Sequence, residues 1–268
     1  MDTLFPRTFV LVFSQLAVGG MFCLSIPPFH ELDRGYYKSS AFVFWAIGSL
    51  ATIGNFALWR RPASSVGGIE VLLWALFCLF GGAYLVSLWY EYFVVRARLF
   101  TATWTLGIVA LLGSALSFAG ESGVPLAHLM YPLSFLLAAL VLGAAASGML
   151  LGHWYLIDRN LSLTPLWNVL QVYLGCLLVQ MAVLVAGAGY LTVVGGDSAS
   201  AWSGYATVFL GRLAISPIGT TVLGLMISRT LLIPQTMAAT GLFYIAILAA
   251  TVGELIGRYL LFRTGFPL

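Results

Sequence analysis

A glutamate and an arginine lie one helical turn apart in the apolar segment ATVGELIGRYLLF, which runs from Ala250 to Phe262. In a helix, Glu254 and Arg258 share one face, because residues four positions apart are neighbours on the helix surface. A carboxylate can accept a proton, and a guanidinium can donate hydrogen bonds to a carbonyl or anionic oxygen. Because a charge inside a bilayer is costly, such residues usually face the protein interior and mark candidate functional sites.

Arg212 is a third charged residue inside an apolar segment. Counted at 1.5 Å per residue from the ends of the expected helices, Arg212 lies about 10 Å and Glu254 about 12 Å from the same side of the membrane. Pro217 frees the carbonyl of Leu213 beside Arg212 and predicts a kink there. We therefore expect Arg212, Glu254 and Arg258 to meet between two neighbouring helices.

Three further polar residues are expected in the same layer. Gln15 lies two to three turns into the first expected helix, Asn55 lies one turn from the end of the second, and Glu70 opens the third. Gly253 and Gly257 form a G-x-x-x-G pattern in the last helix, which permits close helix approach. The layer therefore predicts either a structural ion pair or a ligand pocket. A quinone fits such a pocket, because its carbonyl oxygens need donors and its redox chemistry needs a proton acceptor.

Long apolar segments must position these residues. The chain has 268 residues, of which 61% are hydrophobic and 8% charged, and its mean hydropathy is +1.00, whereas soluble domains carry about 25% charged residues. Helices of about 20 residues cross the roughly 30 Å apolar core of a bilayer. We predict an all-α polytopic integral membrane protein, a single transmembrane domain over residues 1–268. Its eight helices would be Arg7–Pro27, Ser39–Trp59, Ile69–Tyr90, Leu99–Ala119, Met130–Tyr155, Leu166–Val194, Gly204–Leu231 and Gln235–Phe262.

An even number of helices places both termini on one side of the membrane. The loops on the side of the termini carry four basic residues and those on the other side carry six, which favours termini that face away from the cytoplasm. The first set is Arg7, Arg60, Arg61 and Arg263, and the second is Arg34, Lys38, Arg96, Arg98, Arg159 and Arg229.

The same composition argues against other classes of function. The chain has no basic run that would bind nucleic acid, and its three cysteines lie singly in apolar runs, without the spacing of a metal site. A membrane-embedded haem needs histidine ligands. His128 and His153 flank the fifth expected helix about 37 Å apart and cannot share a haem. His30 and His153 lie at or beyond helix ends, so we expect no haem in this chain.

Three segments carry a resemblance to a known family. TVGELIGRYLLF resembles the last helix of the NrfD/DmsC-like membrane-anchor subunits, the quinol-interacting subunits of dimethyl sulfoxide reductase and its relatives. FVLVFSQLAVGGMF, which contains Gln15, resembles the first helix of that family. The segment from Asn55 through RRPASSVGGIE, which ends at Glu70, resembles its junction between helices two and three. Eight helices is also the usual number in the family.

The resemblance implies a quinone site in this chain, for menaquinone or ubiquinone. Glu254 would accept or relay the proton, and the residues that bind quinone would be Gln15, Asn55, Glu70, Arg212 and Arg258. Family members commonly have a histidine at the end of the second helix, where this chain has Asn55. Asparagine can donate a hydrogen bond to a quinone oxygen but cannot take its proton. That leaves Glu254 or Glu70 as proton acceptor, or means that quinol chemistry has been lost.

The resemblance also implies that this chain works in a complex with other subunits. This chain would be the membrane anchor of an oxidoreductase complex in the bacterial cytoplasmic membrane, either non-catalytic or carrying the quinone site. Its partner would be an iron–sulfur subunit of the ferredoxin-like type, often accompanied by a molybdopterin or other catalytic subunit. Two alternatives remain open: a purely structural membrane anchor, and a proton-conducting or transport subunit without quinone chemistry.

Overall fold

The computed structural model describes residues 4–61, 66–90, 92–122, 126–158, 160–194, 204–233 and 235–267. All regular structure within these ranges is helical, which confirms the predicted all-α fold. The helices are α1 (Leu4–Cys23), α2 (Arg34–Trp59), α3 (Gly68–Ser87), α4 (Phe93–Ser122), α5 (Ala127–Ile157), α6 (Thr164–Val194), α8 (Ala206–Leu213), η1 (Ala214–Ile218), α9 (Gly219–Leu232) and α10 (Thr236–Thr264).

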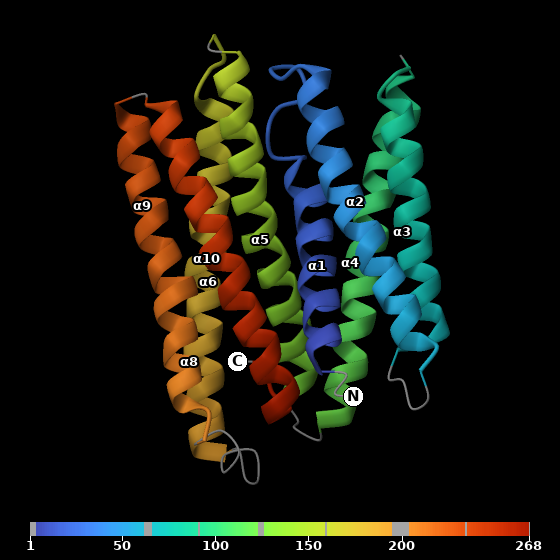
Figure 1. Ribbon diagram of the computed structural model, residues 1–268, viewed down its shortest axis with the longest axis vertical. Helices are drawn as coiled ribbons and strands as arrows, with labels where there is room; N and C mark the ends of the chain where they lie inside the picture. The colour runs from blue at the N-terminus through green and yellow to red at the C-terminus, as the bar shows by residue number, and fades with distance from the viewer. Residues whose placement is uncertain are drawn as a thin grey trace.

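Among the described residues, eight helical spans are long and apolar enough to cross a membrane, with α8, η1 and α9 forming one continuous span. The chain is thus a multi-pass membrane protein, as the sequence predicts. α1 begins and α10 ends at the same end of the bundle (Figure 1). We call this the terminal end and the other the opposite end.

The helix α5 stands at the centre of the bundle, with α1 to α4 on one side and α6 to α10 on the other (Figure 1). The apolar stretch of α5 is 78% buried, against 28% for that of α3. α1 packs so closely on α5 that a Cβ added to Gly19 would lie 1.7 Å from the carbonyl oxygen of Ala139. Such close contact between small residues holds membrane helices together without a hydrophobic driving force.

Several helices begin earlier than the sequence predicts, and the difference is largest for α2 and α4. α2 starts at Arg34 because Asp33 caps it, its carboxylate accepting a hydrogen bond from the backbone N–H of Gly35 at 2.5 Å. α4 starts at Phe93 and so includes Arg96 among its helical residues. Arginine is a good helix former, and its long side chain can carry the charge toward the interface from within a helix. The predicted start points, Ser39 and Leu99, marked only the apolar part of each helix.

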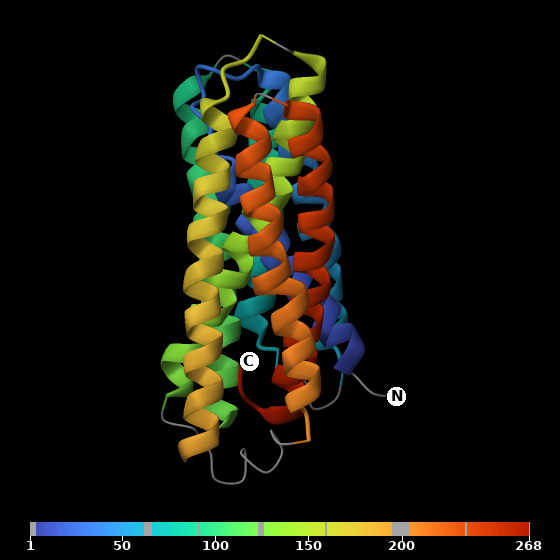
Figure 2. The ribbon, with the colours of Figure 1, turned by 90° about the vertical axis from the view of Figure 1, so that its left-hand side faces the viewer.

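The interruption predicted at Pro217 takes the form of a π-helical turn. η1 joins α8 to α9 in one span that runs along α6 and α10 (Figure 2). Proline has no N–H to continue the α-helical bonding pattern, and the wider π turn absorbs that loss. Short π turns within α-helices are frequent at functional sites, and this one follows directly after the segment that contains Arg212.

Candidate functional site

Glu254 lies at the centre of a buried network on the inner face of α10. Its Oε2 atom is 3.3 Å from Nη2 of Arg212 on α8 and 3.2 Å from Nη2 of Arg258, one turn further along α10. Its Oε1 atom accepts a hydrogen bond from Nε2 of Gln180 on α6. The carboxylate therefore joins three helical spans through three donors.

Arg258 extends this network to the central helix. Its Nη1 donates to the hydroxyl of Ser134 at 3.3 Å, and its Nη2 donates to the Ser134 carbonyl at 3.2 Å. The guanidinium also lies 4.7 Å from the ring centre of Phe135, a distance at which a cation is attracted to an aromatic face. We call Arg212, Glu254, Arg258, Gln180 and Ser134 the ion cluster.

The two glycines of the G-x-x-x-G pattern bring α10 close enough to α8 and η1 for these contacts. A Cβ on Gly253 would lie 2.0 Å from Cβ of Ser216, and a Cβ on Gly257 would lie 2.3 Å from Cζ of Arg212. Both distances are far below van der Waals contact. The Arg212 side chain thus occupies the space that Gly257 leaves by lacking a side chain.

The ion cluster is sealed from solvent. Glu254 has 0% exposure, and Arg212 and Arg258 have 1% each. Two guanidiniums face one carboxylate, and the Nε atoms of both arginines are buried without a hydrogen-bond partner in the described part of the chain. Breaking such a buried pair leaves an uncompensated charge. The arrangement acts as a polar clamp between helices, with its carboxylate already engaged by cationic and amide donors.

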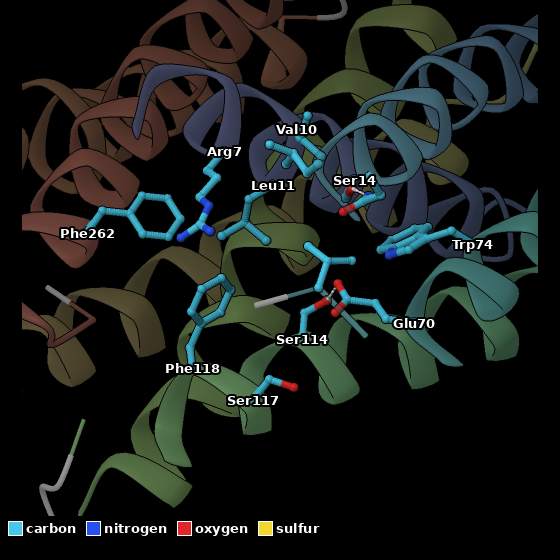
Figure 3. A pocket seen from close by; sticks show the side chains of 13 residues that line it. Arg7, Val10, Leu11, Ser14, Glu70, Trp74, Ser114, Ser117, Phe118 and Phe262 are labelled. Atoms are coloured by element: carbon cyan, nitrogen blue, oxygen red, sulfur yellow. Dashed lines mark hydrogen bonds between the residues drawn. The ribbon is translucent and has the colours of Figure 1, made fainter. Parts of the chain in front are cut away.

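Asn55 and Glu70 lie elsewhere, in a pocket at the terminal end that we call the terminal pocket (Figure 3). Residues of α1, α2, α3, α4 and α10 form most of its wall. The lining residues are Arg7, Val10, Leu11, Ser14, Asn55, Leu58, Val66, Glu70, Trp74, Ser114, Ser117, Phe118 and Phe262.

The Glu70 carboxylate reaches from the first turn of α3 toward α4, where Ser114 donates a hydrogen bond to its Oε1 (Figure 3). Asn55 donates from Nδ2 to the carbonyl of Ala51 at 3.1 Å and, at 3.5 Å, to the hydroxyl of Ser14. Neither of these side chains forms an ion pair with another described residue. The carboxylate of Glu70 therefore keeps hydrogen-bonding capacity for a ligand or for water.

Two donors of the terminal pocket complete no hydrogen bond of their own. Nε of Arg7 is buried without a hydrogen-bond partner among residues that the structure describes, and Nε1 of Trp74, also buried, forms no hydrogen bond of full geometry although it lies beside the Glu70 carboxyl group. Buried polar groups are normally satisfied by protein or by ordered water. The cavity has a volume of about 30 Å³, which is enough for about two water molecules at roughly 10–15 Å³ each. Chemically, this site can hold water beside a carboxyl group.

An aromatic wall separates the two sites. The guanidinium of Arg258 lies over the ring of Phe135. The centre of that ring is 6.1 Å from the centre of the Phe118 ring. Phe118 in turn contacts Phe262 edge-on at 5.5 Å, and these last two rings line the terminal pocket. Gln15 lies beside this wall and outside the terminal pocket: its Nε2 donates to the Phe135 carbonyl at 3.4 Å, and it is not one of the residues that line that pocket.

The six predicted site residues therefore form two groups instead of one layer. Arg212, Glu254 and Arg258 meet as the sequence predicts, with Gln15 nearby, whereas Asn55 and Glu70 face a separate pocket. Gln180 was not among the predicted residues, although a glutamine within the long apolar α6, which has two, is the same kind of signal that identified Gln15 in α1.

The other residues of the two sites, Ser114, Ser134 and Arg7, could not be identified from the sequence. Ser114 and Ser134 are serines in apolar helices, of which the chain has many, and Arg7 was counted only as a loop charge. Comparison of the chain with protein-family models, with curated proteins and with solved structures finds no match.

Proposed function

We propose that this chain is the membrane subunit of a redox complex, which binds a quinone or quinol in the terminal pocket and exchanges electrons with an iron–sulfur partner subunit. The observation that carries the proposal is the Glu70 carboxyl group, which accepts a hydrogen bond from the Ser114 hydroxyl and faces a pocket where Nε of Arg7 has no partner among the described residues. Quinone chemistry couples electron transfer to proton transfer, so it needs a carboxyl group of this kind within reach of the head group.

Each residue of the terminal pocket has a role in this proposal. Asn55, Arg7 and Trp74 supply N–H groups for the quinone oxygens. Glu70 takes or gives the proton, and Ser114 holds its carboxyl group in place. The rings of Phe118 and Phe262 provide flat apolar surfaces for the head group, which is larger than the cavity and would enter by displacing these two half-buried side chains.

The ion cluster has a supporting role. Arg212, Glu254 and Arg258 hold α5, α6, α8 and α10 together behind the aromatic wall, and Gln15 braces α1 against α5. In this assignment the proton acceptor is Glu70, because Glu254 is enclosed by its own partners. The resemblance to quinol-interacting anchor subunits supports the same function and leaves Glu254 or Glu70 as the proton acceptor, whereas the predicted shared depth of the polar residues had favoured Glu254.

The partner subunit would dock at the terminal end, because the quinone pocket lies there. The excess of basic residues in the loops of the opposite end supports an orientation in the bacterial cytoplasmic membrane with the terminal end away from the cytoplasm. An iron–sulfur subunit on that side would receive or deliver the electrons.

A second candidate function is proton conduction without a quinone. The observation in its favour is the size of the cavity, which suits water better than an aromatic ring. A carboxyl group beside water can relay protons between the aqueous edge and the bundle. In this case, Glu70 would be required but no quinone would bind.

The test is purification of the complex from its native membrane in mild detergent, with mass spectrometry of the proteins and quinones that remain bound. We expect a stoichiometric iron–sulfur subunit and about one quinone per chain. The Asn55→Leu variant should retain the partner but lose most of the quinone, whereas Glu31→Gln, a change at the opposite end, should retain both.

Other outcomes separate the alternatives. If the partner subunit copurifies but no quinone is bound, the chain is a purely structural membrane anchor. A chain that contains neither, yet acidifies liposomes under an applied potential and stops doing so after Glu70→Gln, would establish the proton-conducting function instead.

A further inference from the structure

A larger pocket lies at the opposite end of the bundle, between the beginnings of α2 and α4, the end of α3 and the segment after α1. Its volume is about 430 Å³, within the roughly 300–1,000 Å³ of typical ligand pockets. Aromatic and aliphatic side chains form most of its wall, among them Leu32, Tyr37, Tyr84, Leu88, Phe100 and Trp104. We call it the aromatic pocket.

Two arginines line this pocket and flank one aromatic ring. The guanidinium carbons of Arg34 and Arg96 lie 5.4 Å and 4.8 Å from the ring centre of Phe93. Nη1 of Arg96 is buried and has no hydrogen-bond partner in the ranges that the structure describes. Neither guanidinium forms an ion pair within those ranges, so two positive charges face the pocket without a counter-charge there.

Two acidic groups that the structure describes near this end are engaged elsewhere. The Asp33 carboxylate caps α2 by accepting from the N–H of Gly35, and the Glu31 carboxylate accepts from the hydroxyl of Ser162 at 2.9 Å. Neither acid lines the pocket. The lining is therefore basic and apolar, with no carboxylate.

Two other polar groups of the pocket make internal hydrogen bonds. The Tyr37 hydroxyl donates to the carbonyl of Pro27 at 3.2 Å, and the Ser25 hydroxyl donates to that of Phe22 at 2.6 Å. The guanidiniums are thus the principal donors that remain for a ligand. The beginnings of α2 and α4 add the positive ends of two helix dipoles on the same side. The ligand that fits has an anionic head and an apolar body.

We propose that the aromatic pocket binds an anionic phospholipid, with its phosphodiester between Arg34 and Arg96 and its glycerol and upper acyl segments against the aromatic wall. Arginine pairs well with phosphate through charge-assisted hydrogen bonds. Basic pockets between membrane helices are suited to anionic head groups. A small soluble anion would leave the apolar wall uncovered, and a quinone would find no carboxyl group in the lining to exchange its proton.

The test is native mass spectrometry of the detergent-purified complex after addition of phosphatidylglycerol, phosphatidylcholine or glycerol 3-phosphate at equal concentration. We expect retention of one phosphatidylglycerol, at least roughly tenfold more than phosphatidylcholine, because charge-assisted bonds to two arginines distinguish them. Equal retention of the two lipids would overturn the proposal, and binding of glycerol 3-phosphate with the same affinity would show a site for a free phosphate instead.

Variants test whether this pocket holds the lipid. Arg34→Gln combined with Arg96→Gln should reduce retention of phosphatidylglycerol by roughly tenfold or more. Arg60→Gln combined with Arg61→Gln, two basic positions at the terminal end, is the matched control and should leave retention unchanged.

A second variant keeps the proposal testable if the double arginine change prevents folding. Ala97→Trp adds a large ring from the lining of the pocket and leaves both arginines in place. It should also displace the phosphatidylglycerol. Full retention in this variant would overturn the proposal, because the pocket would then be filled and the lipid would have to bind elsewhere.

Discussion

Two glutamates in the apolar helices of this protein, Glu254 and Glu70, differ in what surrounds them. Glu254 meets two guanidiniums and an amide, and it has no exposed surface. Glu70 receives one hydroxyl hydrogen bond from Ser114 and borders a cavity of about 30 Å³. In the sequence both are carboxylates in apolar helices, and the more deeply placed Glu254 attracts more attention.

For these two glutamates, unused hydrogen-bonding capacity is a better sign of proton exchange than depth in the membrane. A carboxylate surrounded by cations has a favourable environment only as long as it stays charged and in place, which suits a structural role. A carboxylate with one neutral partner and space beside it can change its protonation state without breaking an ion pair. The terminal pocket is therefore the better candidate for proton exchange.

The largest expected effect comes from removing the charge of Glu254. Glu254→Gln leaves Arg212 and Arg258 buried without a counter-charge, and loss of one partner of a buried pair costs about 3–5 kcal/mol. We expect little monodisperse protein in size-exclusion chromatography and a large fall in melting temperature. Glu70→Gln, which replaces a half-buried group by a neutral one of the same shape, should cost less than about 1 kcal/mol.

Equal stability of the two glutamine variants would remove the distinction between the sites. A further change tests the cause of the instability. Adding Arg212→Gln to Glu254→Gln removes one of the unpaired cations and should recover part of the lost stability, since residues in one network are not additive. Absence of any recovery would show that the carboxylate acts through something other than charge balance.

The second effect is steric and concerns the close approach of α10 to η1. Gly253→Ala would place a Cβ 2.0 Å from Cβ of Ser216, and such overpacking typically costs about 1–3 kcal/mol. Gly241→Ala, on the same helix, meets nothing within 4 Å and should gain up to about 1 kcal/mol from the better helix propensity of alanine. Melting temperatures of both variants measure this difference, which should be absent if the helices do not pack through Gly253.

Helix number and the meeting of the charged residues could be predicted from the sequence. Apolar length gives the eight spans, because only a helix of that length crosses a bilayer with its backbone satisfied. The contact between Arg212 and Glu254 followed from their similar depth on consecutive spans, since a lone charge in that position needs a partner.

The separation into two sites could not be predicted in the same way. Depth along a helix says nothing about the direction in which a side chain points within the bundle. Ser14 and Gln15 are adjacent in α1, yet Ser14 lines the terminal pocket and Gln15 contacts the backbone of α5. Which neighbour each faces depends on helix order and rotation, which the packing of Gly19 against Ala139 helps to fix.

The third effect distinguishes two serines of the terminal pocket on α4. Ser114 donates to Glu70, whereas Ser117 lines the same pocket but donates to the carbonyl of Gly113. Ser114→Ala should slow quinol-linked turnover by roughly fivefold, because loss of one hydrogen bond worth about 1 kcal/mol frees the carboxyl group. Ser117→Ala should leave turnover unchanged. Identical rates in the two variants would show that Ser114 does not position Glu70.

The smallest effect is expected at Gln15, and it tests to which site this residue belongs. Its Nε2 makes one long hydrogen bond of 3.4 Å to the Phe135 carbonyl, and its Oε1 is buried without a partner in the described structure. Gln15→Leu replaces a side chain whose hydrogen bonds are poorly satisfied by an apolar side chain of similar size. The free energy of unfolding should therefore change by less than about 1 kcal/mol. Bound quinone should also be unchanged, in contrast to Asn55→Leu. Loss of quinone from the Gln15 variant would mean that the aromatic wall opens and that the two sites act as one.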